Sequence, residues 1–184
     1  MMSKEDFINK HELITHIAEI RKRLFVSVLV FIGLFACCYF FSQEIYQILL
    51  QPLKESYNDF SNKRVIYTNP AEGFLTYLKL SFFGAIFVGL PFFLLQIYLF
   101  IAPALYKKEK KFTLVLIFFI PLLFFFGSLI AYKFIFPLCF KFFLAFENFN
   151  ISGLNIEMEA KISEYLSLFI HLILGFSLAF QAPL

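Results

Sequence analysis

Residues 24–41 read LFVSVLVFIGLFACCYFF, a stretch of eighteen positions without a charged side chain. At about 1.5 Å of rise per residue, a helix over this stretch is roughly 27 Å long and just crosses the hydrocarbon core of a bilayer. The whole chain has the same character, with 60% hydrophobic residues, 16% charged residues and a mean hydropathy of +0.78. The hydrophobic residues form long runs instead of being spread over the core positions of a soluble domain. The sequence therefore predicts an all-α, polytopic integral membrane bundle.

Three further apolar runs bring the total to four predicted spans. We expect the spans at about residues 24–41, 74–101, 112–136 and 162–184. Gly89 and Pro91 predict a kink in the second span, and Pro137 is expected to end the third. No charged residue follows the fourth run, whereas a complete membrane protein usually places charges beyond its last span. We therefore expect a single membrane domain over residues 1–184 that is truncated at its C-terminus, with further helices missing.

The polar connections contain recognisable helix boundaries. Residues 42–73 are expected to be a water-facing connection, because prolines and asparagines interrupt them. Near their end, Asn69, Pro70 and Glu72 suit the N-cap, first and third positions of a helix. The connection over residues 137–161 is predicted to be an external hairpin or a short interfacial helix.

The segment before the first span, residues 3–23, is charged at both ends of an apolar stripe. This pattern predicts an amphipathic helix that lies on the membrane surface before the chain turns inward. Basic residues indicate the orientation, because cytoplasmic loops are enriched in Lys and Arg. Residues 1–23 and 102–111 carry nine of them, whereas residues 42–73 and 137–161 carry five. The first two segments are therefore predicted to be cytoplasmic, with the N-terminus inside, and the other two periplasmic.

The sequence contains no motif of a catalytic, metal or nucleotide-binding site. Its titratable residues lie mostly in the connections, and Cys37, Cys38 and Cys139 lack the spacing of a metal site. The net charge of +3 includes no run of five or six like charges, which disfavours nucleic acid as a partner. We therefore expect a protein that is not an enzyme and has no cofactor.

Two short motifs on the predicted cytoplasmic side carry a resemblance to a known family. Residues 16–24 read HIAEIRKRL, and residues 101–111 read IAPALYKKEKK. The first resembles the HLxELRxRL signature that opens TatC proteins, and the second is similar to the first cytoplasmic loop of that family. The other matching positions are Pro52, Pro70, Glu72, Phe74, Pro91, Phe124, Gly127, Tyr132, Phe136, Pro137, Tyr165, Phe180 and Pro183. The resemblance covers essentially the whole chain, but TatC proteins have six spans and this sequence supplies the first four.

The resemblance implies the core receptor subunit of the twin-arginine translocase, a protein of the inner membrane. Such a subunit binds twin-arginine signal peptides and organises the export of folded proteins, driven by the proton-motive force. It is expected to work with single-span subunits of the TatA and TatB type and to form homo-oligomers. The runner-up interpretation is a small secondary transporter whose kinked helices line a substrate path. A membrane enzyme is a third alternative and would need a converging catalytic set.

The resemblance implies a signal-peptide site on the predicted cytoplasmic face. Physical chemistry agrees with this recognition, because paired guanidinium groups need carboxylates near the membrane surface. By the resemblance, the binding residues are Glu19, Arg21 and Glu109. The supporting motif residues are His16, Arg23, Pro103, Leu105 and Tyr106. The residues alone leave a simpler alternative, in which Glu19 pairs with Lys22 or Arg23 along its own helix. In the same way, Glu109 would balance the lysines around it as a solvated loop charge.

Two polar residues lie inside the predicted fourth span. Gln181 stands where many family members have a glutamate, and we expect it to bind a partner helix or to open a polar path. His171 has no such support from the resemblance and is expected to form a hydrogen bond between helices. Ser177 replaces the usual glycine shortly before Gln181.

Overall fold

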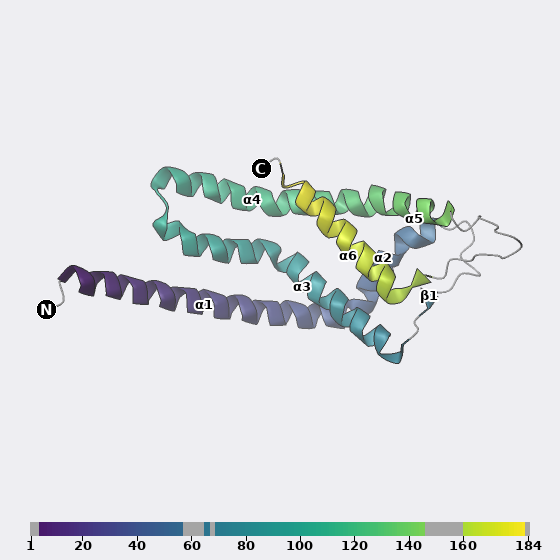
Figure 1. Cartoon of the computed structure of the whole chain (residues 1–184), viewed down its shortest axis with the longest axis horizontal. Coiled ribbons are helices and arrows are strands. Elements are labelled where there is room, and N and C mark those ends of the chain that lie inside the picture. Colours follow the sequence, from purple (N-terminus) through teal and green to yellow (C-terminus); the bar gives the residue numbers. More distant parts are fainter. Residues whose placement is uncertain (1–3, 57–64, 67–68, 146–159, 183–184) are drawn as a thin grey trace, which may run out of the picture.

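The computed structural model describes residues 4–56, 65–66, 69–145 and 160–182. In this part of the chain the elements are α1 (Lys4–Phe40), α2 (Ser42–Ser56), β1 (Val65–Ile66), α3 (Pro70–Ile101), the 3-10 turn η1 (Ala102–Ala104), α4 (Lys107–Ile130), the π-helical segment η2 (Ala131–Ile135), α5 (Phe136–Ala145), β2 (Ala160–Lys161) and α6 (Ile162–Ala179). Figure 1 shows the helices as an elongated bundle. The two short strands pair in parallel.

Four helical segments are long and apolar enough to cross a membrane. They are Ala18–Phe40, Pro70–Ile101, Glu109–Phe143 and Ile162–Ala179. A small share of each segment is buried within the chain, as expected of helices that lipid surrounds. These segments confirm the predicted all-α membrane bundle with four spans. The fourth is shorter than predicted, because α6 ends at Ala179 and a turn follows it.

α1 is one continuous helix of 37 residues and about 55 Å. The prediction of a surface helix that turns inward before the first span is therefore wrong. No glycine or proline precedes Gly33, so nothing breaks the helix where the charged segment meets the apolar run. Across this junction, the hydroxyl of Ser27 donates to the carbonyl of Arg23 at 2.9 Å.

α3 begins as predicted. Asn69 has an extended backbone, and its side-chain oxygen accepts the N–H of Ala71 at 3.1 Å. The Glu72 carboxylate accepts the N–H of Asn69 at 3.4 Å, and Pro70 takes the first position, where no donor is needed. Figure 1 shows α3 changing direction partway along its length, in agreement with the kink expected from Pro91.

Residues 42–56 form the helix α2, which differs from the predicted water-facing connection because one side of it is buried. Tyr46, Leu49 and Leu53 belong to the hydrophobic core, and α2 packs against α5 and α3. Their spacing of three, four and seven residues is that of one helical face. Pro52 lies inside α2 and does not end it.

Tyrosines from two other elements complete the hydrogen bonding around Pro52. Because a proline has no N–H, the carbonyl of Ile48, four residues earlier, has no donor in its own helix. The hydroxyl of Tyr132 in η2 donates to this carbonyl at 2.8 Å. The hydroxyl of Tyr165 in α6 donates to the neighbouring carbonyl of Leu49 at 2.5 Å. These bonds tie α2 to the third and fourth spans.

The third span continues past the residue that was expected to end it. Pro137 is the second residue of α5, which runs to Ala145. Just before it, the N–H of Phe136 donates to the carbonyl of Ala131, five residues back. This wider π-helical turn makes room for the proline ring, which in a regular helix would clash with the carbonyl four residues earlier. The rest of the predicted external hairpin lies largely in residues 146–159, outside the described residues.

The core lies around α2, α5 and the first half of α6. The ring of Phe136 contacts the rings of Phe140, Tyr165 and Phe169, with ring centres 4.9 to 5.4 Å apart. α4 and α6 cross closely at Gly127, where an added Cβ would lie 3.0 Å from the backbone of α6. α1 packs mainly against α3, so much of its surface is left for lipid.

Candidate functional site

The N-terminal half of α1 carries the first group of predicted site residues. Glu19 and Arg23 are about one helical turn apart, and Nη2 of Arg23 lies 2.5 Å from Oε1 of Glu19. Both side chains are partly buried, with 24% of Arg23 and 37% of Glu19 exposed. Arg21 is exposed on the same helix. His16 also lies in α1, but its side chain is outside the described part of the structure.

The second group lies at the start of α4. Oε2 of Glu109 accepts the N–H of Tyr106 at 3.2 Å, so this carboxylate caps its own helix. Tyr106 and Pro103 are exposed, and Leu105 is half-buried. The polar turn between the second and third spans is shorter than predicted, because α4 already begins at Lys107.

A buried tyrosine that the sequence analysis did not single out supports the start of α4. Tyr98 of α3 is 6% exposed, and its hydroxyl donates to the carbonyl of Lys110 at 3.4 Å. A tyrosine hydroxyl in an apolar helix needs such a partner. A tyrosine within an apolar run of the sequence is therefore the signal that could have indicated this contact. The contact joins the first turn of α4, which contains Glu109, to α3.

The two groups lie toward the same end of the bundle, on helices that α3 separates. Figure 1 shows the N-terminal half of α1 and the turn between α3 and α4 at this end. Within the described residues, no hydrogen bond or ion pair joins Glu19 to Glu109, and each carboxylate is bound inside its own helix. The local pairing of Glu19 with Arg23, one of the alternatives, is present. For Glu109 the observed partner is a backbone amide instead of a lysine.

The two polar residues of the predicted fourth span lie differently from expectation. Gln181 is in the turn after α6 and not inside the helix, because α6 ends at Ala179. Its N–H donates to the carbonyl of Leu178 at 3.0 Å, and its side chain is half-buried. His171 is exposed, and its Nδ1 lies 2.6 Å from the carbonyl of Ser167 in the same helix. Its expected hydrogen bond to another helix is therefore not formed within the described residues.

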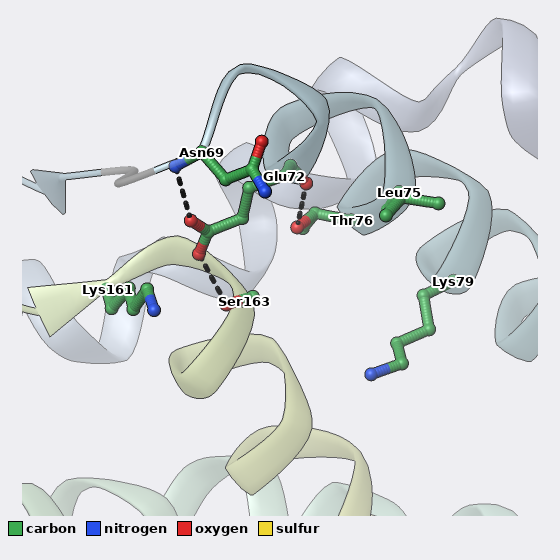
Figure 2. Close-up of a pocket in the computed structure, with 7 residues that line it drawn as sticks. All are labelled: Asn69, Glu72, Leu75, Thr76, Lys79, Lys161 and Ser163. Atoms are coloured by element: carbon green, nitrogen blue, oxygen red, sulfur yellow. Dashed lines mark hydrogen bonds between the residues drawn. The ribbon is translucent and has the colours of Figure 1, made fainter.

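A second polar site lies at the opposite end of the bundle, where α3 and α6 begin. Its cavity of about 400 Å³ is lined by Asn69, Glu72, Leu75, Thr76, Lys79, Lys161 and Ser163 (Figure 2). The hydroxyl of Ser163 donates to the buried carboxylate of Glu72, which also caps α3. Nζ of Lys79 lies 3.4 Å from Oγ of Ser167 in α6. No local sequence pattern indicates this junction of two spans, because Glu72 and Ser163 are 91 residues apart.

Comparison with known proteins gives a consistent family. The family described as Sec-independent protein translocase protein (TatC) matches residues 15–184. The TatC protein of Rickettsia prowazekii (strain Madrid E) is 44% identical over 169 residues, which are 92% of this chain and 66% of that protein. The TatC protein of Magnetococcus marinus is 42% identical over 178 residues, with 97% and 63% of the two chains covered. The TatC protein of Escherichia coli (strain K12) is 36% identical over 182 residues, with 99% and 67% covered.

The fold has a solved counterpart. A crystal structure described as the twin arginine translocase receptor TatC superposes with a TM-score of 0.72 at 29% identity, covering 91% of this chain and 71% of that one. The chain spans about two thirds of the length of the curated relatives that it matches. Sequence and fold agree over nearly all of the residues available for comparison. The chain belongs to the TatC family of Sec-independent protein translocase proteins.

Proposed function

We propose that this chain forms the receptor part of a twin-arginine translocase, which binds twin-arginine signal peptides and organises the export of folded proteins. The observation that carries the proposal is a pair of carboxylates, Glu19 and Glu109, that lie toward one end of the bundle on separate helices. Family membership supports it, since a solved relative is described as a twin arginine translocase receptor.

The chemistry of paired arginines suits this arrangement. A guanidinium group is planar, permanently charged and able to donate two parallel hydrogen bonds to one carboxylate. Glu19 on α1 and Glu109 on α4 would each accept one guanidinium group of the peptide. Arg21, exposed near Glu19, would contact carbonyl or acidic groups of the same peptide. The turn over residues 103–106 would present Glu109 to it.

The proposal includes an orientation and partners. The N-terminus and the turn between α3 and α4 would face the cytoplasm, and α2 and the strand pair would face the periplasm, with the chain in the inner membrane. Export would be driven by the proton-motive force and would involve TatA and TatB type subunits and further copies of this chain. The exposed His171 on α6 marks a face for a partner helix, because an imidazole in lipid favours a polar neighbour.

The small-transporter alternative has no observation of its own in its favour. The family match accounts for residues 15–184 without it. The prolines that suggested broken spans lie within continuous helices, Pro91 in α3 and Pro121 in α4.

Photo-crosslinking tests the receptor function. The probe is a synthetic twin-arginine signal peptide with a photoreactive residue beside the arginine pair, added to membranes that contain the full chain. We expect crosslinks to the N-terminal half of α1 and to the start of α4. They should weaken in Glu19→Gln, in Glu109→Gln and with a peptide whose arginines are replaced by lysines. The matched control is Glu164→Gln, which removes an exposed carboxylate at the other end of the bundle.

Equal crosslinking of both site variants, the control and the parent would show that Glu19 and Glu109 are ordinary surface charges. Absence of crosslinking to the parent would contradict the receptor function itself.

A further inference from the structure

Arg23 presents to Glu19 the same chemical group that a twin-arginine peptide would present. Its Nη2 lies 2.5 Å from Oε1 of Glu19 within α1. We propose that Arg23 is an internal competitor, whose guanidinium group occupies the Glu19 carboxylate in the empty receptor and must be displaced by the incoming peptide. This inference rests on the proposed function, because it concerns the affinity of the same site.

The burial of the pair shows why it can be displaced. Arg23 is 24% exposed, and its Nε is buried with no hydrogen-bond partner in the described part of the chain. A guanidinium group has five N–H donors, and a buried donor without a partner is costly. When a peptide takes Glu19, the Arg23 side chain is free to turn toward water, where its donors are satisfied. Hydration of the Arg23 donors therefore lowers the free-energy cost of separating Arg23 from Glu19.

Helix geometry makes the pair a property of α1 alone. Residues four apart lie on one face of a helix, so Glu19 and Arg23 meet without help from another element. Lys22 carries the same charge one residue away but is exposed and faces elsewhere on the helix. It therefore provides a matched control for the loss of a positive charge near the site.

The Glu19–Arg23 pair sets the minimum binding free energy that a peptide must supply at this site. Every ligand that needs Glu19 must first open the pair, so the apparent affinity falls by the same factor for each of them. A twin-arginine peptide overcomes this cost because it places a guanidinium fork on each of two carboxylates. A peptide with ammonium groups gains less binding free energy from each contact, too little to offset the cost of opening the Glu19–Arg23 pair. Arg23 would thus prevent signal peptides of low affinity from binding.

Peptide affinity in nanodiscs tests the competitor role. The probes are a fluorescent twin-arginine peptide and its twin-lysine version, measured against the full chain and its variants. An ion pair of this kind is worth up to about 1 kcal/mol, so Arg23→Gln should bind both peptides about two- to fivefold more tightly than Lys22→Gln. In a Glu19→Gln background, Arg23→Gln should have no further effect, because no carboxylate is left to release. Arg23→Met, which keeps the apolar stem, should bind both peptides as tightly as Arg23→Gln. The melting temperature of each variant shows whether it is folded.

Three outcomes separate this inference from the proposed function. If the parent does not bind the twin-arginine peptide, the receptor function fails and the competitor role fails with it. If the parent binds through Glu19 but Arg23→Gln is no tighter than Lys22→Gln, the competitor role alone is overturned. If both Arg23 variants bind more weakly and Arg23→Lys restores binding, Arg23 positions Glu19 for the peptide and does not compete with it, which also overturns the inference.

Discussion

Replacing Gly127 by alanine is expected to destabilise the crossing of α4 and α6. A Cβ at this position would lie 3.0 Å from the Cα of Ser177, 3.2 Å from the carbonyl oxygen of Phe176 and 3.2 Å from the Cβ of Phe180. Two of these atoms belong to the backbone, so the helices must move apart to admit the methyl group. Such overpacking costs about 2 kcal/mol. For a chain of this size, that loss lowers the melting temperature by about 4 to 8 °C.

Gly175 provides the control within the same pair of helices. A Cβ there meets no atom within 4 Å, so Gly175→Ala should stabilise α6 by about 0.5 to 1 kcal/mol through the loss of backbone freedom in the unfolded chain. The assay is thermal unfolding of the purified chain in detergent, followed by circular dichroism at the helix band, because the sequence contains no Trp to serve as a fluorescent probe. A melting temperature of Gly127→Ala equal to that of Gly175→Ala would refute the close crossing.

Two tyrosines give further predictions with the same assay. Tyr132→Phe removes the donor to the carbonyl of Ile48 that Pro52 leaves without a partner, so it should cost about 1 kcal/mol and lower the melting temperature by about 2 to 4 °C. An unchanged melting temperature would show that water replaces the tyrosine. Tyr46→Phe should raise stability, because the Tyr46 hydroxyl is buried without a hydrogen-bond partner in the described part of the chain. Burial, and then the neighbouring Tyr77, raise the pKa of Tyr46 from 10 to about 12. The unfolded chain therefore loses this proton first, and stability should fall as the pH rises from 10 toward 12. That alkaline loss should be smaller in Tyr46→Phe, and equal pH profiles for the two proteins would contradict the assignment.

Local sequence signals predicted the number of spans and one helix start correctly. The four apolar runs are long enough to be recognised without any knowledge of packing. Asn69, Pro70 and Glu72 act within one turn of helix, so their roles at the helix start follow from a stretch of four residues. The pairing of Glu19 with Arg23 is local in the same way and was available as an alternative from the spacing.

The features that the sequence did not reveal depend on contacts between distant residues. Pro52 was interpreted as a break, but α2 continues because Tyr132, 84 residues away from Ile48, supplies the missing donor. Pro137 was expected to end the third span, but a π-helical turn before it relieves the clash. The junction of Glu72 with Ser163 likewise links helices that no short pattern connects. The candidate binding residues came from the resemblance to TatC, since isolated carboxylates carry no signal of their role.

The unbroken α1 has a mechanical consequence. Its contacts with α3 include Phe31 and Cys38, in its C-terminal half, whereas Glu19 lies twelve residues before Phe31. A straight helix over that interval is a rigid lever of about 18 Å. A tilt of about 10° around the Phe31 contact would therefore carry Glu19 through about 3 Å, the length of one hydrogen bond. Small changes in bilayer thickness or in the packing on α3 would in this way alter the gap between Glu19 and Glu109 without unfolding any helix.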